Sequence, residues 1–117
     1  MKRVYFCYPY RDNPRERTAE INLIIERLHE QYPEANFFYP HFAFPNWEGT
    51  FGRKYALRCT QDEVSRSDEM WIAYRPLSIG MKRDVKIANQ LNIPVKDKTQ
   101  EVRSILKFKI LKKQDNN

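Results

Sequence analysis

The sequence has little glycine and no long apolar run. Only three of its 117 residues are glycine, so no flexible linker or low-complexity segment divides the chain. No apolar stretch approaches the roughly 20 residues that a membrane-spanning helix needs. The apolar part of the opening "MKRVYFCYPY" is short and is interrupted by Pro9, which argues against a signal peptide. We therefore expect a cytoplasmic protein with one domain over residues 1–113, a polar tail at 114–117 and no membrane partner.

Cysteine is also scarce. Cys7 and Cys59 form no CxxC pair, and neither has a histidine at metal-ligand spacing. Isolated cysteines of this kind usually pack as small hydrophobic side chains. We expect no metal site and no cofactor.

Positive charge exceeds negative charge. The net charge is +6, and the chain from Lys96 onward holds seven basic and three acidic residues. A basic chain end suits either a nucleic-acid contact or a solvated surface. Because the lysines are spread among apolar residues, we favour the solvated surface and do not expect nucleic acid as the partner.

Hydrophobic periodicity predicts strands that alternate with helices. Asn13 is a suitable N-cap for the first helix, with Pro14 at its first position and Glu16 three residues after the cap. Residues 40–52 are rich in aromatics, lack a period and are predicted to form a loop. The predicted helices cover 14–32, 53–67 and 81–91, and the predicted strands cover 3–8, 36–40, 69–74, a segment starting at 92, and 104–111.

The predicted inward faces follow from the same spacing. The first helix presents Ile21, Ile24, Ile25, Leu28 and Tyr32; the second presents Tyr55, Ala56, Cys59 and Val64; the third presents Met81, Val85, Ala88 and Leu91. The C-terminal stretch fits two patterns, a helical face at Val102, Ile105 and Leu106 and a strand alternation at Leu106, Phe108 and Ile110. We predict the strand, because alternation suits an element at a sheet edge.

This order of elements indicates an α/β fold with a doubly wound parallel sheet of about five strands. The arrangement is the three-layer one of Rossmann-like and flavodoxin-like proteins, in a single domain. Ligands bind such sheets beyond the carboxyl ends of the strands, where helix N-termini point. Two loops are predicted there, "YPYRDN" at 8–13 and "YRPLSIG" at 74–80.

The first loop has features of an anion site. The helix start at Asn13 offers free backbone N–H groups, and Arg11 could add a bidentate contact to a phosphate. Tyr8 and Tyr10 offer flat faces for a base or sugar. The alternative is that Asn13 only caps the helix and that the tyrosines pack beneath the loop.

The second loop leads to a carboxylate. Ser78 and Gly80 precede the predicted helix, and Gly80 would let a ligand approach the backbone closely. Asp84, expected one turn into that helix, could act as a nucleophile toward an anomeric carbon or stabilise an oxocarbenium-like transition state. The alternative is a solvated first-turn acid that favours the helix dipole.

The aromatic segment between these loops supplies further candidates. His41 could reach a ligand as a proton donor or as a hydrogen-bond partner of phosphate, or it could be structural. Trp47 and Phe51 could form a stacking lid or fill a hydrophobic gap.

Three segments carry a resemblance to a known family: "VYFCYPYR", "SDEMWIAYRPLSIGMKRDVKIA" and "LNIPV". Together they resemble the nucleoside 2-deoxyribosyltransferase superfamily over roughly residues 4–95. Within it, the chain is similar to the deoxynucleoside 5′-monophosphate N-hydrolases, which have a Tyr-Phe-Cys strand and a Ser-x-Gly-x-x-x-Glu segment. It also resembles small bacterial and phage proteins with a Pro-Tyr turn, a Pro-His/Phe-Pro stretch and an Asp-Glu-x-Trp strand before a Gly-Met segment.

The resemblance implies roles for individual residues. Tyr5 would place an aromatic ring near the ligand, and the turn at 8–11 would bind phosphate. Ser78 matches a serine that contacts phosphate or sugar, and Met81 belongs to the Gly-Met segment of the binding region. Asp84 matches the catalytic Glu, which attacks the anomeric carbon and forms a glycosyl-enzyme intermediate.

Three departures from the family pattern weaken the expectation of turnover. Asp84 is one methylene shorter than the family's Glu, and a shift of about 1 Å in a reacting group can cost on the order of a hundredfold in rate. Tyr8-Pro9-Tyr10 replaces a Gly-Ser turn and removes an N–H donor. A family acid on the second helix has no counterpart in register, since Asp62 lies two residues away.

Two functions follow from the resemblance. The first is a nucleotide-binding enzyme that cleaves or transfers at the N-glycosidic bond of a nucleoside 5′-phosphate. The second is a non-catalytic nucleotide-binding protein, such as a phage protein that sequesters a nucleotide-derived immune signal in the host cytoplasm. The resemblance also implies a homo-oligomer in which neighbouring subunits complete the pocket.

Overall fold

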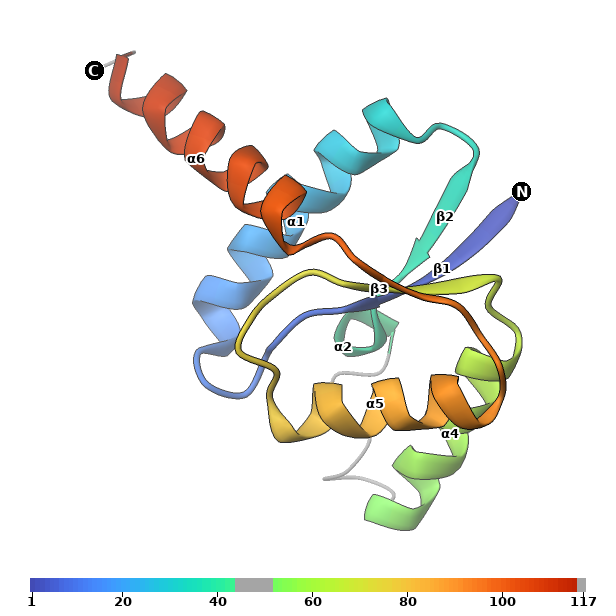
Figure 1. Cartoon of the computed structure of the whole chain (residues 1–117). Coiled ribbons are helices and arrows are strands. Elements are labelled where there is room, and N and C mark those ends of the chain that lie inside the picture. The colour runs from blue at the N-terminus through green and yellow to red at the C-terminus, as the bar shows by residue number, and fades with distance from the viewer. Residues whose placement is uncertain (44–51, 116–117) are drawn as a thin grey trace.

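The computed structural model describes residues 1–43 and 52–115, and its elements alternate between strands and helices (Figure 1). In chain order they are β1 (Lys2–Cys7), α1 (Pro14–Gln31), β2 (Ala35–Phe38), α2 (Pro40–Ala43), α4 (Arg53–Ser65), β3 (Glu69–Ile72), α5 (Ile79–Gln90), β4 (Val95–Asp97) and α6 (Thr99–Asp115).

The strands form one parallel sheet in the order β2-β1-β3-β4. Helices α1 and α6 cover one face, while α4 and α5 cover the other (Figure 1). The predicted α/β class with a three-layer, doubly wound parallel sheet is therefore confirmed. The described residues form four strands and not five, because the predicted C-terminal strand is a helix.

Alternation along β1 builds a separate core on each face of the sheet. Val4 and Phe6 point toward α1 and α6, where they join a cluster with Trp71 of β3. Tyr5 and Cys7 point the other way and pack with residues of α4 and α5. Every one of these side chains is almost completely buried.

Helix α1 begins as the sequence predicts. The Asn13 side-chain oxygen accepts the Glu16 backbone N–H at 3.3 Å, and the Asn13 amide donates to the Glu16 carboxylate at 2.8 Å. This reciprocal pairing satisfies a backbone donor that an uncapped helix start leaves open. The predicted inward face is also confirmed, with Ile21, Ile24 and Leu28 fully buried.

The prediction of a strand at 104–111 is wrong, because this segment lies within α6. Val102 and Ile105, one helical turn apart, are both buried in the core beneath α1. The Tyr32 hydroxyl at the end of α1 donates to Glu101 at 2.9 Å and holds the start of α6 in place. Phe108, which a strand would place beside Leu106, is 57% exposed. Packing against α1 thus selects the helical pattern.

Three smaller predictions are corrected. Tyr55, expected to face inward, is 48% exposed on α4. Leu91, also expected inward, is the exposed C-cap of α5, and Ile87 is buried on this helix. Part of the loop expected at 40–52 forms the short helix α2, and positions 44–51 lie outside the described residues.

A buried carboxylate joins three of the four strands. Glu69, at the start of β3, accepts a hydrogen bond from the Trp71 indole at 2.6 Å. It also pairs with Lys2 of β1 at 3.1 Å and with Lys96 of β4 at 2.9 Å. Burial opposes ionisation, but the hydrogen bonds from Trp71, Lys96 and Lys2 hold the pKa of Glu69 below its usual range.

We expect Glu69→Gln to lower the free energy of unfolding by about 1–3 kcal/mol at pH 7, because two lysines lose their shared anion. Since the folded-state pKa is depressed, this stabilisation is present above the unfolded pKa near 4.3 and is lost as pH falls. Urea unfolding at pH 7 and pH 3 measures both effects.

Glu30→Gln is the matched control, because Glu30 forms an exposed pair with Arg27 at 2.8 Å and should contribute no more than about 0.5 kcal/mol. Equal losses in the two variants would contradict the role assigned to Glu69.

Candidate functional site

The topology of the sheet places a site between β1 and β3. The chain leaves β1 toward β2 on one side and leaves β3 toward β4 on the other, so the two following loops diverge at this point. Ligands of doubly wound sheets bind in the crevice at such a switch point. The loops there span residues 8–13 and 73–78.

A carboxylate and a phenol meet on the α5 side of this switch point. The Tyr5 hydroxyl donates to an Asp84 carboxylate oxygen across a long 3.4 Å hydrogen bond. Tyr5 is 1% exposed, while Asp84 is partly buried and reaches solvent. Burial raises the pKa of Asp84 to about 7, although the Arg83 charge and the Tyr5 hydrogen bond act in the opposite direction.

Two ionisable neighbours of Asp84, the Cys7 thiol and the Tyr5 phenol, are kept protonated by their surroundings. Burial, and then the nearby Asp84 carboxylate, raise the pKa of the Cys7 thiol well above its usual range. The same two causes raise the pKa of Tyr5, which also lies beside Thr60 of α4. At neutral pH, Asp84 is therefore the group here that exchanges a proton, because both neighbours stay protonated.

The start of α5 combines a serine cap with a glycine one turn before Asp84. The Ser78 hydroxyl caps the helix and accepts the Met81 backbone N–H at 3.2 Å. Gly80 lies four residues before Asp84 on the same helix face, and helical side chains lean toward the preceding turn. Gly80 carries no side chain, and a Cβ placed there would lie 3.8 Å from the Arg83 guanidinium and 4.0 Å from the Ser78 hydroxyl.

The helix starts at Ile79, two residues earlier than predicted, so Asp84 lies in the second turn and not in the first. Its carboxylate is consequently farther from the positive end of the helix dipole than the sequence suggested. Met81 is buried in the core beneath α5, where its side chain packs with Tyr5 and Met70.

A second group of predicted residues lies at the ends of β1 and β2. The rings of Tyr10 and His41 stack with centroids 4.3 Å apart and an interplanar angle of 12°. The Tyr39 hydroxyl donates to the Pro9 carbonyl at 3.2 Å and fixes the loop above β2. Burial, and then the Arg11 charge, lower the pKa of His41 to about 4, so its imidazole is neutral at pH 7.

The remaining predicted residues lie elsewhere. Tyr8 faces the α1 side of the sheet, opposite to Tyr5 and Asp84, and packs edge-to-face on Tyr74 at 5.6 Å. Asn13 caps α1, and both its side-chain oxygen and its amide bond to Glu16. Trp47 and Phe51 lie outside the described residues.

Sequence reasoning missed Arg17, which lies beneath the loop at 8–13. Its guanidinium contacts Asp12, Glu20 and the Tyr74 hydroxyl. In the sequence it is one of several charges in "PRERTAE", a pattern typical of a solvated helix surface. Only the tertiary contact with Tyr74, 57 residues away, distinguishes it from its neighbours.

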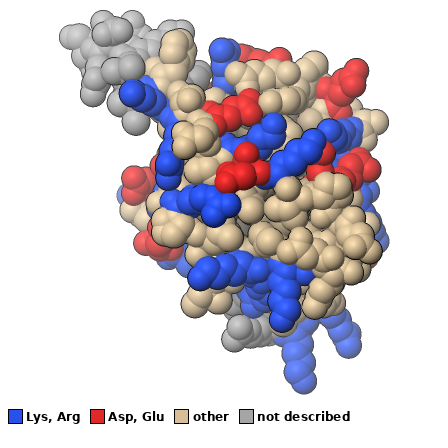
Figure 2. Space-filling model, in the orientation of Figure 1, with Lys and Arg blue, Asp and Glu red and all other residues tan. Residues whose placement is uncertain are grey.

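Positive charge borders the helix that carries Asp84. In Figure 2, Lys and Arg side chains project from the lower part of the molecule, where α5 and α4 lie in Figure 1. On the upper part of the same face, basic and acidic side chains are interspersed. A local positive field of this kind attracts anionic ligands.

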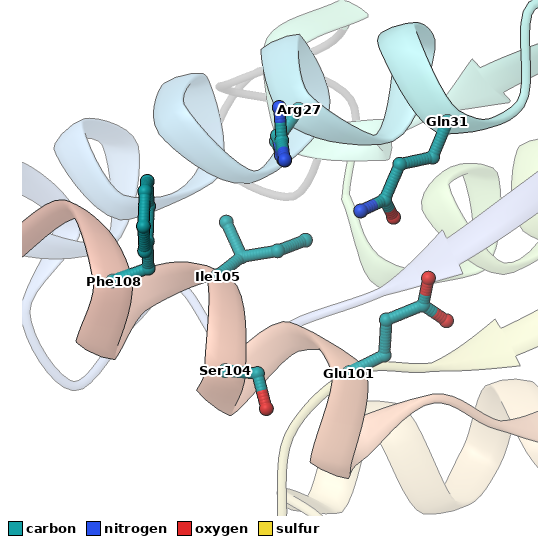
Figure 3. Close-up of a pocket in the computed structure, with 6 residues that line it drawn as sticks. All are labelled: Arg27, Gln31, Glu101, Ser104, Ile105 and Phe108. Atoms are coloured by element: carbon teal, nitrogen blue, oxygen red, sulfur yellow. The ribbon is translucent and has the colours of Figure 1, made fainter.

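A separate groove of about 280 Å³ lies between α1 and α6 (Figure 3). None of the residues predicted to bind a nucleotide lines it, so it is distinct from the candidate site. Its lining consists of Arg27, Gln31, Glu101, Ser104, Ile105 and Phe108.

Residues 1–43 and 52–115 contain no cluster of three His, Cys, Asp or Glu side chains arranged to hold a metal ion. None of the helices described there combines the length and the apolar character needed to cross a membrane.

The fold and the site define an α/β protein whose strand order is that of flavodoxin-like sheets, with a partly buried carboxylate beside the switch point. Comparison with family models gives a match. It belongs to the family described as a domain of unknown function (DUF7768), whose model matches residues 2–98. No curated protein matches the chain.

We expect Asp84→Asn to raise the free energy of unfolding by about 1–3 kcal/mol at pH 8 and to leave it nearly unchanged at pH 4. The folded-state pKa near 7 lies above the unfolded value near 4, so ionisation of Asp84 destabilises the fold as pH rises between these values. Thermal or urea unfolding over this pH range measures the difference.

Asp62→Asn is the control for this substitution, because Asp62 is an exposed partner of Arg66 at 3.0 Å. An identical stability change at pH 4 and pH 8 for Asp84→Asn would show that Asp84 has an ordinary pKa.

Proposed function

We propose that this protein binds a nucleoside 5′-phosphate and cleaves or transfers at its N-glycosidic bond, with Asp84 as the nucleophile. The single observation that carries the proposal is the partly buried Asp84 carboxylate, held at 3.4 Å from the buried Tyr5 hydroxyl beside the switch point. The sequence resemblance to nucleoside 2-deoxyribosyltransferases supplies the reaction class.

The proposed chemistry has two steps. A carboxylate oxygen of Asp84 attacks the anomeric carbon, the C–N bond breaks, and the bonding electron pair leaves with the base, which takes up a proton. Water or a second base then attacks the same carbon and releases Asp84 as a carboxylate. The Tyr5 hydroxyl holds the attacking oxygen in place through its hydrogen bond.

The phosphate would lie at the start of α5. Backbone N–H groups near Ser78 and Gly80 offer donors, and the helix dipole favours an anion at this end. A Cβ placed on Gly80 would lie 3.8 Å from the Arg83 guanidinium, so Arg83 adds positive charge beside the same position. Arg11 adds a second cation at the neighbouring loop.

Release of free base from a panel of nucleoside 5′-monophosphates, followed by chromatography, tests the proposal. We expect release by the wild-type protein, a loss of at least about a hundredfold for Asp84→Asn, and no loss for the Asp62→Asn control. Because the nucleophile must be ionised, the rate should rise with pH through about 7. Absence of release across ribo- and deoxyribonucleotides would refute the enzymatic proposal.

Gly80→Ala separates ligand access from folding. Gly80 does not have a positive φ, and an added Cβ would make only ordinary contacts, at 3.8 Å to Arg83 and 4.0 Å to Ser78. We therefore expect unchanged or slightly higher thermal stability, since alanine favours helices over glycine by up to about 1 kcal/mol.

In the same variant, nucleotide affinity measured by calorimetry should fall by about tenfold or more, because the new methyl group would lie against Arg83 and Ser78, where the phosphate is proposed to bind. Unchanged affinity would show that the ligand does not pass this turn of α5.

A second candidate function is binding without turnover. One argument for it is the pKa of Asp84 near 7, which leaves about half of the molecules with a neutral, non-nucleophilic acid at pH 7. Another is that the Asp84 side chain is one methylene shorter than the Glu of the nucleoside 2-deoxyribosyltransferases that the sequence resembles. Such a protein would sequester a nucleotide-derived molecule, as a phage protein acting against an immune signal would. Recovery of an intact nucleotide after heat denaturation of the purified protein supports this function, while recovery of free base excludes it.

A further inference from the structure

Arg17 is a partly buried charge that the proposed chemistry does not use. Its side chain is 12% exposed and lies on the α1 side of the sheet, away from Asp84. Its guanidinium is 2.7 Å from Asp12 and 2.8 Å from Glu20. It also donates to the Tyr74 hydroxyl at 3.1 Å.

These partners belong to different parts of the candidate site. Asp12 lies in the loop at 8–13, which also carries Tyr10 and Arg11, whereas Tyr74 lies in the loop at 73–78 that leads into α5. One guanidinium is therefore bonded to both loops that follow the switch-point strands.

The aromatic contacts reinforce the connection. The Arg17 guanidinium lies 4.5 Å from the centroid of the Tyr74 ring and 5.9 Å from that of Tyr8. These two rings pack edge-to-face on each other across the two loops. A planar guanidinium can bond to carboxylates in its plane and stack on rings with its faces, which a lysine ammonium cannot do.

The charges around Arg17 argue against a phosphate site. Two carboxylates, Asp12 and Glu20, already contact the single guanidinium, so the cluster carries a net charge of −1. The hydrogen bond from Arg17 is the main cause that lowers the pKa of Asp12, which keeps this carboxylate ionised. An incoming phosphate would meet two anions at this position.

We infer that Arg17 is a positioning residue that couples the loop at 8–13 to the loop at 73–78. Through Tyr74 it restrains the segment that leads to Ser78 and α5, and through Asp12 it restrains the segment that carries Arg11. The consequence for ligand binding rests on the proposed function, whereas the coupling between the loops does not.

Amide chemical shifts from NMR of the unliganded protein test the coupling. We expect Asp12→Asn to shift amide signals of residues 74–80 and Tyr74→Phe to shift those of residues 10–13, because both act through the same guanidinium. In an Arg17→Lys background, each of these remote shifts should fall to less than about half its size, since only the direct contact between Tyr8 and Tyr74 still joins the loops. Both partner substitutions are conservative, so the test does not depend on a variant that fails to fold.

Arg27→Lys is the matched control. Arg27 lies on the same helix and pairs only locally with Glu30, so this background should leave the remote shifts intact. Remote shifts that keep their full size in Arg17→Lys, or that are absent in the wild-type background, would overturn the inference.

Affinity for nucleoside 5′-monophosphates provides the second readout. If the loops hold opposite ends of the ligand, Arg17→Lys should weaken binding by about fivefold or more, while Arg27→Lys should not. Absence of binding by the wild-type protein would refute the proposed function, and the shift experiment would still decide the role of Arg17. Wild-type binding that Arg17→Lys leaves unchanged would refute the positioning role.

Discussion

The parallel pairing of β1 with β3 is the constraint on which the rest of the structure depends. It brings strands separated by more than sixty residues into register, with Tyr5 opposite Met70. It also makes the two following loops neighbours at one edge of the sheet. Helix α1 then descends on one face and α5 on the other, so Arg17 and Asp84 approach the same edge from opposite sides. The positions of both Asp84 and Arg17 therefore follow from this pairing.

The charged side chains that are largely enclosed by the fold differ in how many partners compensate them. Glu69 has two lysines and an indole around it, and Arg17 has two carboxylates and a phenol. Asp84 has one long hydrogen bond from Tyr5, and burial raises its pKa although this bond and the Arg83 charge act in the opposite direction. The charges of Glu69 and Arg17 are thus compensated by their partners, while Asp84 at the switch point carries a charge that burial disfavours. Perturbed groups of this kind concentrate at functional sites, where stability is exchanged for reactivity.

Local patterns in the sequence predicted those features that local forces determine. The Asn13 cap and the buried face of α1 depend on spacing alone, and both were predicted correctly. The last helix was mistaken for a strand because Leu106 fits both patterns and Phe108 continues the alternation. Only the burial of Val102 and Ile105 beneath α1 decides between them. Arg17 could not be singled out, since its importance comes from a tyrosine 57 residues later. The meeting of Tyr5 and Asp84 requires the whole βαβ topology.

The two outer strands carry a consequence for self-association. β4 has only three residues, and its exposed Lys96 and Asp97 are engaged with Glu69 and Arg75. β2, at the opposite border, has four residues. The short, charged border at β4 gives an incoming strand few backbone partners and little apolar surface to cover, which protects this border against amyloid-like stacking. At β2, which is the mostly apolar segment Ala35–Phe38, the length of only four residues limits the backbone partners that an added strand would find.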